Sequence, residues 1–209
     1  ITSRTKAIMV TNLFGHPAYL KKLREIADRN KIYLIEDNAQ SPLAKEFGQC
    51  SGTIGHIGVL SFNYHKHIHT GEGGCCLTND KNLAERLQLL RNHGEAVIEN
   101  DNKTNFTNII GSNFRMTEIQ AAIGLVQCED INKHISKRVE IAEFLSNQIV
   151  NISGIQEPIV RNDCNHVYYC WGIKIDENNL GISRKILSKA LNAEGFPHGI
   201  GYIKPLYQL

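Results

Sequence analysis

The N-terminal part of the chain alternates between apolar runs and a helix-like pattern, which limits the possible folds more than any other feature of the sequence. Residues 7–10 (AIMV) and 32–35 (IYLI) have the composition of buried strands. Between them, apolar residues recur with helical spacing from Leu20 to Ala27, after Pro17, a residue favoured in the first turn of a helix. Strand, helix and strand in this order predict a βαβ unit and therefore a parallel sheet.

The following segments continue the α/β pattern. Residues 56–62 and 75–78 are predicted strands on either side of a glycine-rich turn at residues 71–74. A helix is predicted from about Asp80 to about His93. Residues 95–111 are polar and rich in Asn, and a loop of this length is usually functional or disordered.

Two helices are predicted next. The first begins at a capping box, in which Thr117 is followed three residues later by Gln120. We expect four of its apolar side chains to face inward: Ile119, Ala122, Ile123 and Val126. The second is predicted over residues 131–150, and five of its apolar residues are in helical register: Ile135, Val139, Ala142, Leu145 and Ile149.

The last part of the chain predicts a different arrangement. Residues 168–175 are a strand candidate, residues 183–193 are a predicted helix, and a glycine-rich bend follows. These elements have the pattern expected at the start of a second, smaller α+β domain. No internal repeat is present.

The composition excludes several classes of protein. Of the 209 residues, 42% are hydrophobic, which is enough to bury a core. The 23 basic and 21 acidic side chains nearly balance, so no nucleic-acid partner is expected. No apolar run approaches the roughly 18 residues needed to cross a bilayer, so no membrane partner is expected. The chain begins at Ile1 and stops at Leu209 after an apolar stretch, and we therefore expect a fragment.

The cysteines indicate a compartment. All six lie outside any CxxC pair and do not resemble a disulfide framework. We expect buried free thiols in a reducing environment, the cytoplasm. Cys75 and Cys76 are adjacent in a predicted strand, where neighbouring side chains face opposite sides, so we expect two buried thiols rather than a redox pair.

Several chemistry-bearing residues follow the predicted strands. Asp37 ends one strand, Ser61 closes another, and Lys66 lies between that strand and the glycine turn. In parallel sheets, ligands bind at the carboxyl ends of the strands. A lysine there can form a Schiff base with a carbonyl, and a carboxylate can keep a pyridine nitrogen protonated. Taken singly, each residue is more typical of a solvated surface or a turn; together with Gln40 they have the donor types that pyridoxal phosphate requires.

The motifs around these residues carry a resemblance to a known family. Besides Lys66 they are residues 35–40 (IEDNAQ), 58–62 (GVLSF), 71–74 (GEGG), 90–94 (LRNHG) and 111–122 (GSNFRMTEIQAA). In this order the sequence resembles the DegT/DnrJ/StrS family of pyridoxal-phosphate-dependent nucleotide-sugar aminotransferases. The resemblance covers nearly the whole chain.

The resemblance implies an α/β fold, that of the fold-type-I pyridoxal-phosphate-dependent transferases. This fold has a mostly parallel sheet flanked by helices, and here the start of a smaller α+β C-terminal domain is expected. Residues 1–132 would be part of the large cofactor-binding domain, and residues 133–209 would be the linking helix and an incomplete small domain. The first part of the large domain and most of the small domain would be missing.

The resemblance also implies a role for individual residues. Lys66 would form the internal aldimine and move protons, and Asp37 would pair with the pyridinium nitrogen. Gln40 would lie close to the phenolic oxygen of the cofactor, and Ser61 would bind its phosphate. Asn113 matches an asparagine that reaches the cofactor phosphate of the neighbouring subunit, which implies a homodimer with shared active sites.

The implied reaction moves an amino group, from glutamate, onto a keto group of a nucleotide-activated deoxysugar. In this family a histidine in place of the lysine marks a sugar dehydratase. Lys66 lies five residues after Ser61 and five before Gly71, as the family lysine does, which favours the aminotransferase. A dehydratase and a non-catalytic regulatory member remain alternatives, and His65 and Asn38 depart from the usual family residues.

A metal site is a competing interpretation of the same segment. His65, His67 and His69 alternate, so on a strand they would share one face and could bind zinc. The glycine turn that follows and the lack of a paired carboxylate count against it, and no metal is expected.

Overall fold

The computed structural model describes residues 1–95, 109–201 and 206–208. The predicted loop at residues 95–111 lies mostly outside this part of the chain. The chain forms two compact units. Unit 1 comprises Ile1–Ala142 and Val160–Trp171, and unit 2 comprises Glu143–Ile159 and Gly172–Leu209.

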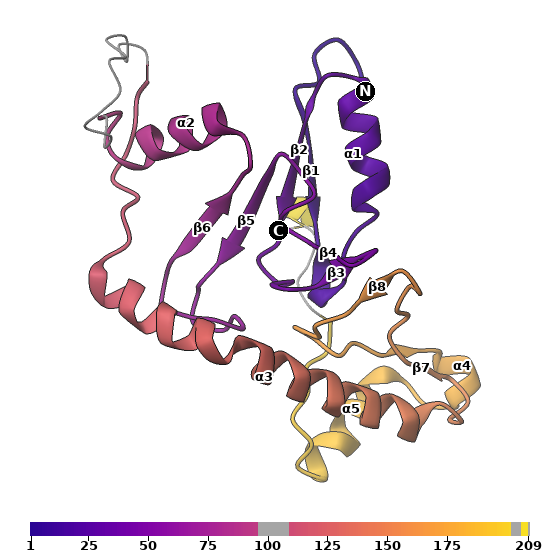
Figure 1. Ribbon diagram of the computed structural model, residues 1–209. Helices are drawn as coiled ribbons and strands as arrows, with labels where there is room; N and C mark the ends of the chain where they lie inside the picture. Colours follow the sequence, from indigo (N-terminus) through magenta and orange to yellow (C-terminus); the bar gives the residue numbers. More distant parts are fainter. Residues whose placement is uncertain (96–108, 202–205, 209) are drawn as a thin grey trace. The chain divides into compact units, whose positions relative to one another are not determined.

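Unit 1 is built on a four-stranded sheet in the order β1-β2-β5-β6 (Figure 1). The strands are β1 (Ala7–Thr11), β2 (Tyr33–Asp37), β5 (Ile57–Ser61) and β6 (Gly74–Leu77). The first three are parallel, and β6 is antiparallel to β5. All four predicted strands are therefore present, with their ends shifted by a residue or two, and the expected βαβ unit is confirmed.

Helix α1 (Leu20–Arg29) runs beside β1 and β2 (Figure 1). Its buried Ala27 packs with Ile32 and Leu34 to form the core of this region. Burying a Leu or Ile side chain contributes roughly 1.5–3 kcal/mol to the free energy of folding, so this contact fixes the helix on the sheet. A short 3₁₀ helix (Leu13–Gly15) lies in the connection from β1 to α1.

A second, small antiparallel sheet has the order β4-β3-β8. It consists of β3 (Lys45–Glu46), β4 (Gln49–Cys50) and β8 (Cys164–Asn165). Because β8 comes from the second chain segment of unit 1, this sheet brings residues 160–171 back to the N-terminal part of the unit.

Helix α2 (Lys81–Arg91) follows β6. The Asp80 side chain accepts hydrogen bonds from the backbone N–H groups of Asn82 and Leu83, which is the usual arrangement of a helix N-cap. The helix predicted between Asp80 and His93 is thus confirmed.

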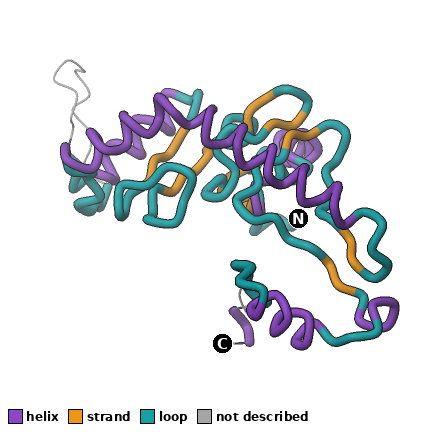
Figure 2. Tube along the Cα trace, turned by 90° about the horizontal axis from the view of Figure 1, so that it is seen from below, coloured by secondary structure: helices purple, strands orange, loops and turns teal. Residues whose placement is uncertain are grey.

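Helix α3 (Glu118–Ile149) is one continuous helix of 32 residues, seen as an unbroken coil in Figure 2. The capping box is confirmed, because Thr117 Oγ1 accepts from Gln120 N at 3.3 Å and Gln120 Oε1 accepts from Thr117 N at 3.0 Å. The prediction of two separate helices is wrong. Residues 127–130 (QCED) are polar but contain neither Gly nor Pro, so nothing ends the first helix.

The inward face expected for the first half of α3 is also wrong. Ile119 is 75% exposed, Val126 65% and Ile123 45%, and Ala122 is exposed as well. In the second half, the predicted register is confirmed, since five apolar residues are buried or half-buried there: Ile135, Val139, Ala142, Leu145 and Ile149.

Unit 2 contains a two-stranded antiparallel sheet of β7 (Ile155–Gln156) and β9 (Lys174–Ile175). It also contains α4 (Glu177–Leu180), α5 (Arg184–Ala193) and a final 3₁₀ turn (Leu206–Gln208). The helix predicted at residues 183–193 is confirmed, and Ser183 Oγ caps it by accepting from Ile186 N.

The strand predicted at residues 168–175 is reduced to Lys174–Ile175. Tyr168 has a φ of +48°, which is incompatible with a strand. Residues on both sides of Tyr168 bond to the connection after β1 instead: Val167 N donates to Gly15 O, and Cys170 N donates to Phe14 O.

Among the described residues, no helix has the length and apolarity required to cross a membrane. All six cysteines are free. None is fully buried, and Cys76 and Cys128 are exposed, so the expectation of buried thiols is wrong.

Candidate active site

The carboxyl edge of the main sheet brings two predicted site residues together. Asp37 and Ser61 are the last residues of β2 and β5, which are parallel neighbours paired through Asp37 and Val59. The half-buried Asp37 carboxylate accepts from Ala39 N at 3.1 Å and from Thr11 Oγ1 at 3.5 Å. No basic side chain pairs with this carboxylate within the described ranges, so it is available to a cationic ligand group.

Glu36 precedes Asp37 and has a different role. Its side chain is fully buried, whereas that of Asp37 is half-buried, as expected for successive strand residues that face opposite sides. The Glu36 carboxylate accepts from Gly52 N at 2.6 Å, Ile54 N at 2.8 Å and Gly55 N. It therefore holds the loop that leads into β5, a role that no sequence pattern indicates.

A buried polar network continues from Glu36. Asn12, which is also fully buried, donates from Nδ2 to Glu36 Oε2 at 3.2 Å and to Asn38 Oδ1 at 2.9 Å. Asn38 Nδ2 donates in turn to Ser51 O at 3.1 Å. Buried polar groups of this kind are stabilising only when they are paired, so the network fixes the backbone on both sides of Asp37.

Gln40 is buried close to the same edge. Its side-chain Oε1 accepts from Phe14 N at 2.7 Å, which links the residues after β2 to the connection after β1. Phe14 has a φ of +60°, a conformation that is rare for a bulky residue and is found where the surroundings impose it.

Lys66 lies in the turn between β5 and β6. The Lys66 N–H donates to Asn63 O at 2.9 Å, and Asn63 N donates to Ser61 Oγ at 3.3 Å, so the turn is tied to the end of β5. Lys66 is half-buried, and its Nζ lies 4.9 Å from the centroid of the Tyr169 ring. No carboxylate pairs with this amine among the residues that the structure describes.

His67 connects the same turn to the segment that carries Tyr169. It is only 8% exposed, and its Nε2 lies 3.2 Å from Val167 O. A carbonyl oxygen can only accept, so Nε2 carries the proton and Nδ1 is the acceptor. Burial lowers the pKa of His67 to about 4, which keeps the ring neutral at pH 7. No sequence pattern indicates that His67 is a structural link or that Tyr169 lies beside Lys66.

Arg161 anchors this returning segment. Its guanidinium donates to Glu46 Oε1 at 2.7 Å, to Pro17 O at 3.0 Å and to Ala18 O at 3.1 Å, and it lies 4.0 Å from the centroid of the Tyr19 ring. Glu46 is 1% exposed. A partly buried guanidinium with this many acceptors is well compensated, so Arg161 holds residues 160–171 against the N-terminal part of unit 1.

The same cluster is the group of potential metal ligands in the described part of the chain. Ligand atoms of Glu46, Asp163 and Cys164 lie within 4.8 Å of one another. Arg161 already binds all three, with Nε 3.2 Å from Asp163 Oδ1 and Nη2 2.8 Å from Cys164 Sγ. Burial raises the pKa of the Cys164 thiol to about 11, which disfavours a thiolate ligand. The arginine therefore supplies the cation of this cluster.

The histidines considered for zinc do not lie on a strand. His65, His67 and His69 are in the turn between β5 and β6, and only His67 is buried. Cys75 is half-buried and Cys76 is exposed, so the expectation of two buried thiols is wrong. Partial burial raises the pKa of the Cys75 thiol, as expected for an unreactive cysteine.

Asn113 is exposed and precedes α3. Its Oδ1 accepts from Arg115 N at 3.3 Å, and its backbone forms a bridge with Asn92. These contacts do not involve Asp37 or Lys66. The structure therefore brings four of the five predicted site residues to the β2 and β5 ends and adjoining loops, and it leaves Asn113 on the surface.

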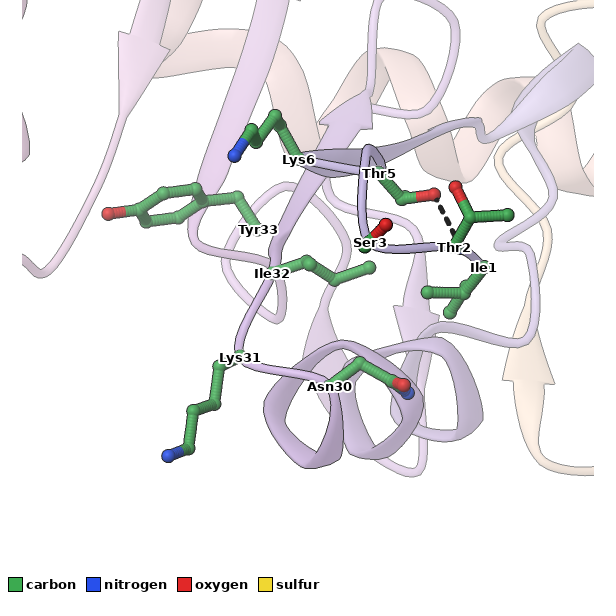
Figure 3. Close-up of a pocket in the computed structure, with 9 residues that line it drawn as sticks. All are labelled: Ile1, Thr2, Ser3, Thr5, Lys6, Asn30, Lys31, Ile32 and Tyr33. Atoms are coloured by element: carbon green, nitrogen blue, oxygen red, sulfur yellow. Dashed lines mark hydrogen bonds between the residues drawn. The ribbon is translucent and has the colours of Figure 1, made fainter.

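A pocket of about 560 Å³ lies at the opposite end of the sheet (Figure 3). Its walls come from residues 1–3, 5–6 and 30–33, which lie before β1 and at the start of β2. Because Asp37 and Ser61 lie at the carboxyl ends of the strands, this pocket is not part of the candidate active site.

The residues at the carboxyl edge fit pyridoxal phosphate. The cofactor needs a carboxylate for its ring nitrogen, a lysine for its aldehyde, and hydroxyl or amide donors. Asp37 and Lys66 are half-buried and belong to no ion pair among the described residues, so both are free to bind charged groups of a ligand. Ser61 and Gln40 supply the hydroxyl and the amide.

This fold and donor set are those expected of pyridoxal-phosphate-dependent α/β transferases. The chain belongs to the DegT/DnrJ/EryC1/StrS aminotransferase family, whose sequence model matches residues 1–209. The family resemblance and the fold class expected from the sequence are confirmed.

Two curated relatives show the similarity in sequence. The chain is 35% identical to a GDP-perosamine synthase of Caulobacter vibrioides, over 93% of this chain and 52% of that protein. It is 31% identical to a dTDP-3-amino-3,4,6-trideoxy-alpha-D-glucose transaminase of Streptomyces venezuelae, over 99% of this chain and 52% of that protein. The chain thus spans about half the length of these relatives.

Two solved structures show the similarity in fold. A family aminotransferase from Brucella abortus superimposes with a TM-score of 0.85 and 31% identity, over 98% of this chain and 52% of that one. The GDP-4-keto-6-deoxy-D-mannose-3-dehydratase of E. coli with bound hydrated PLP superimposes with a TM-score of 0.79 and 29% identity, over 93% and 53%. Pyridoxal phosphate is thus the cofactor of this family, as the sequence predicted.

Proposed function

We propose that the full-length protein is a pyridoxal-phosphate-dependent aminotransferase. It transfers an amino group from glutamate to a keto group of a nucleotide-activated deoxysugar. The observation that carries the proposal is the position of Lys66: it lies in the turn after β5, the strand next to the one that ends at Asp37, and its amine has no carboxylate partner in the described chain. The names of the relatives, a GDP-sugar synthase and a dTDP-sugar transaminase, support the substrate class.

Each residue at the edge has a chemical task in this proposal. Pyridoxal phosphate, when bound, supplies an electron sink that stabilises negative charge on the carbon next to the transferred nitrogen. Asp37 would hold a proton on the ring nitrogen through its carboxylate. Gln40 would lie near the phenolic oxygen, and Ser61 would donate its hydroxyl to the phosphate.

Lys66 has two tasks. Its amine is the attachment point for the cofactor, which keeps the cofactor oriented between turnovers. When it is detached, Nζ acts as the base that removes a proton from the α-carbon of the amino donor, and as the acid that returns it. The flexible four-carbon side chain of Lys66 and the glycine-rich turn that follows it allow the amine to move between these two positions.

We infer a homodimer in which Asn113 serves the site of the other subunit. Apolar side chains are exposed around Asn113, before and within the first half of α3: Ile110, Phe114, Ile119, Ile123, Leu125 and Val126. A concentration of exposed apolar residues is typical of an interaction surface.

The six free cysteines support a cytoplasmic location. The division into a large domain over residues 1–132 and a linking helix with a partial small domain over 133–209 is part of the same proposal.

The half-reactions test this function. Glutamate added to the full-length protein loaded with pyridoxal phosphate should bleach the absorbance of the aldehyde form of the cofactor. A GDP- or dTDP-linked keto-deoxysugar should then restore it, and mass spectrometry should detect the amino sugar. Lys66→Ala should abolish both changes, whereas Lys22→Ala, an exposed lysine of α1, should leave them intact.

The alternatives give different results. A dehydratase would release ammonia and remove a hydroxyl group from the sugar. A regulatory member of the family would not bleach with glutamate or with any other amino donor. Either result would overturn the proposed aminotransferase activity.

A further inference from the structure

The segment from His166 to Cys170 contacts two loops of unit 1 that are far apart in the sequence, and through one of them it is linked to a third. Val167 N donates to Gly15 O at 2.9 Å, and Cys170 N donates to Phe14 O at 3.2 Å. The Val167 carbonyl accepts from His67 Nε2 at 3.2 Å. Phe14 N in turn donates to Gln40 Oε1. The segment therefore joins the β1 connection, Gln40 and the turn that carries Lys66.

Gly15 shows how closely this segment approaches. A Cβ at this position would lie 2.7 Å from Tyr168 N and 2.8 Å from Tyr169 N, and Gly15 has a φ of +104°. Both the space and the backbone conformation require glycine. His166 and Tyr168 stack at a centroid distance of 4.0 Å, which further fixes the conformation on either side of Val167.

Tyr169 is the residue that this arrangement presents to Lys66. Its ring centroid lies 4.9 Å from Lys66 Nζ, within the range of a cation–π interaction. The rings of His65 and His67 lie 6.2 Å and 6.0 Å from the Tyr169 ring, so the residues on both sides of Lys66 also face it. The aromatic face is thus the group next to the amine on which the proposed reaction depends.

His67 fixes the position of that aromatic face. Its side chain is buried, and it bonds the carbonyl two residues before Tyr169. Because His67 follows Lys66 directly, one hydrogen bond ties the turn of the lysine to the segment of the tyrosine. His67 Nδ1 is buried without a hydrogen-bond partner in the described chain, and a buried unpaired polar atom reduces the stability of the fold.

We propose that Tyr169 is a positioning residue for the Lys66 amine, and that His67 acts through the Val167 carbonyl to hold Tyr169 in place. The ring face stabilises the ammonium form of the detached lysine and restricts Nζ to one side of the turn. This inference rests on the proposed function of Lys66, although the geometry that it describes exists in the protein without cofactor.

The geometry can be measured in the cofactor-free, full-length protein by NMR of lysine labelled with ¹³C at Cε. The Lys66 signal is identified by its loss in Lys66→Arg. A methylene group over an aromatic face experiences the ring current, so the Lys66 Hε signals should be displaced upfield in the wild type and in Tyr169→Phe. They should return to the position of ordinary lysines in Tyr169→Leu. Unshifted signals in the wild type, or equal shifts in Tyr169→Leu, would overturn the proposal.

A matched pair of variants tests the role of His67. His67→Gln keeps a side-chain N–H for Val167 O and should retain the upfield shift, whereas His67→Leu should lose most of it. If His67→Leu keeps the full shift, His67 does not position Tyr169. Circular dichroism shows whether each variant is folded, and Tyr169→Met replaces Tyr169→Leu if the leucine variant does not fold.

The kinetic consequence is a two- to fivefold slower half-reaction with glutamate in Tyr169→Leu, from the usual strength of a cation–π contact, with Tyr169→Phe close to the wild type. If His67 acts only through Tyr169, His67→Leu should add nothing in the Tyr169→Leu background. Additive effects would contradict the coupling.

Borohydride labelling separates the two proposals: a label away from Lys66 refutes the proposed function, whereas a label on Lys66 with no effect of Tyr169→Leu refutes only this inference.

Discussion

Replacing Glu36 by Gln should cost far more stability than the change of one atom suggests. The carboxylate is fully buried and accepts four hydrogen bonds, from Gly52 N, Ile54 N, Gly55 N and Asn12 Nδ2. A glutamine has one acceptor oxygen, and its amide hydrogens would face N–H donors. Two charge-assisted hydrogen bonds would be lost, each worth roughly 1.5–3 kcal/mol, so we expect a loss of about 3–6 kcal/mol.

Urea unfolding monitored by circular dichroism measures this loss. Typical domains have a free energy of unfolding of about 5–15 kcal/mol, so the midpoint should fall strongly or the variant should be partly unfolded. Glu25→Gln on the exposed face of α1 is the matched control and should change the stability by less than about 0.5 kcal/mol. A loss below about 1 kcal/mol in Glu36→Gln would refute the view that this carboxylate holds the loop before β5.

Three further predictions concern the same unit. Burial lowers the pKa of His67 and His166 from 6.5 to about 4, so between these pH values the unfolded chain binds more protons than the folded chain. The free energy of unfolding should therefore fall by about 3 kcal/mol per histidine as the pH decreases from 6.5 to 4. A urea midpoint that stays constant over this range would contradict the prediction. Gly15→Ala should destabilise by about 3 kcal/mol in thermal unfolding because its Cβ meets backbone atoms, whereas Gly172→Ala, with nothing within 4 Å, should be nearly neutral. Arg161→Lys should cost about 2 kcal/mol in urea unfolding, because an ammonium cannot reach the carbonyl and carboxylate acceptors together, and an unchanged midpoint would show that the guanidinium does not anchor the segment.

The carboxyl-edge residues were predictable because each follows directly from a local pattern. Asp37 and Ser61 end apolar runs, and parallel strands necessarily place such ends on one edge. Successive strand residues face opposite sides of a sheet, which predicts different surroundings for Glu36 and Asp37. The backbone donors of the Glu36 carboxylate, however, come from a loop 16 to 19 residues away, and no periodicity indicates them.

The contacts around Lys66 could not be predicted in the same way. His67 and Val167 are 100 residues apart, and they meet only because Arg161 and β8 return residues 160–171 to unit 1. The long helix α3 shows a different limit. Helical spacing of Ile119 and Val126 defines an apolar face, but it does not say whether this chain covers it, and here both residues are exposed.

The most direct test of the central claim, that the carboxyl edge of this sheet holds pyridoxal phosphate through Lys66, is peptide mapping after borohydride reduction. The full-length protein is incubated with the cofactor, reduced and digested, and the labelled residue is identified by mass spectrometry. The account predicts a single label on Lys66 that disappears in Lys66→Ala and remains in Lys22→Ala. A label on another lysine, or covalent cofactor retained by Lys66→Ala, would contradict it.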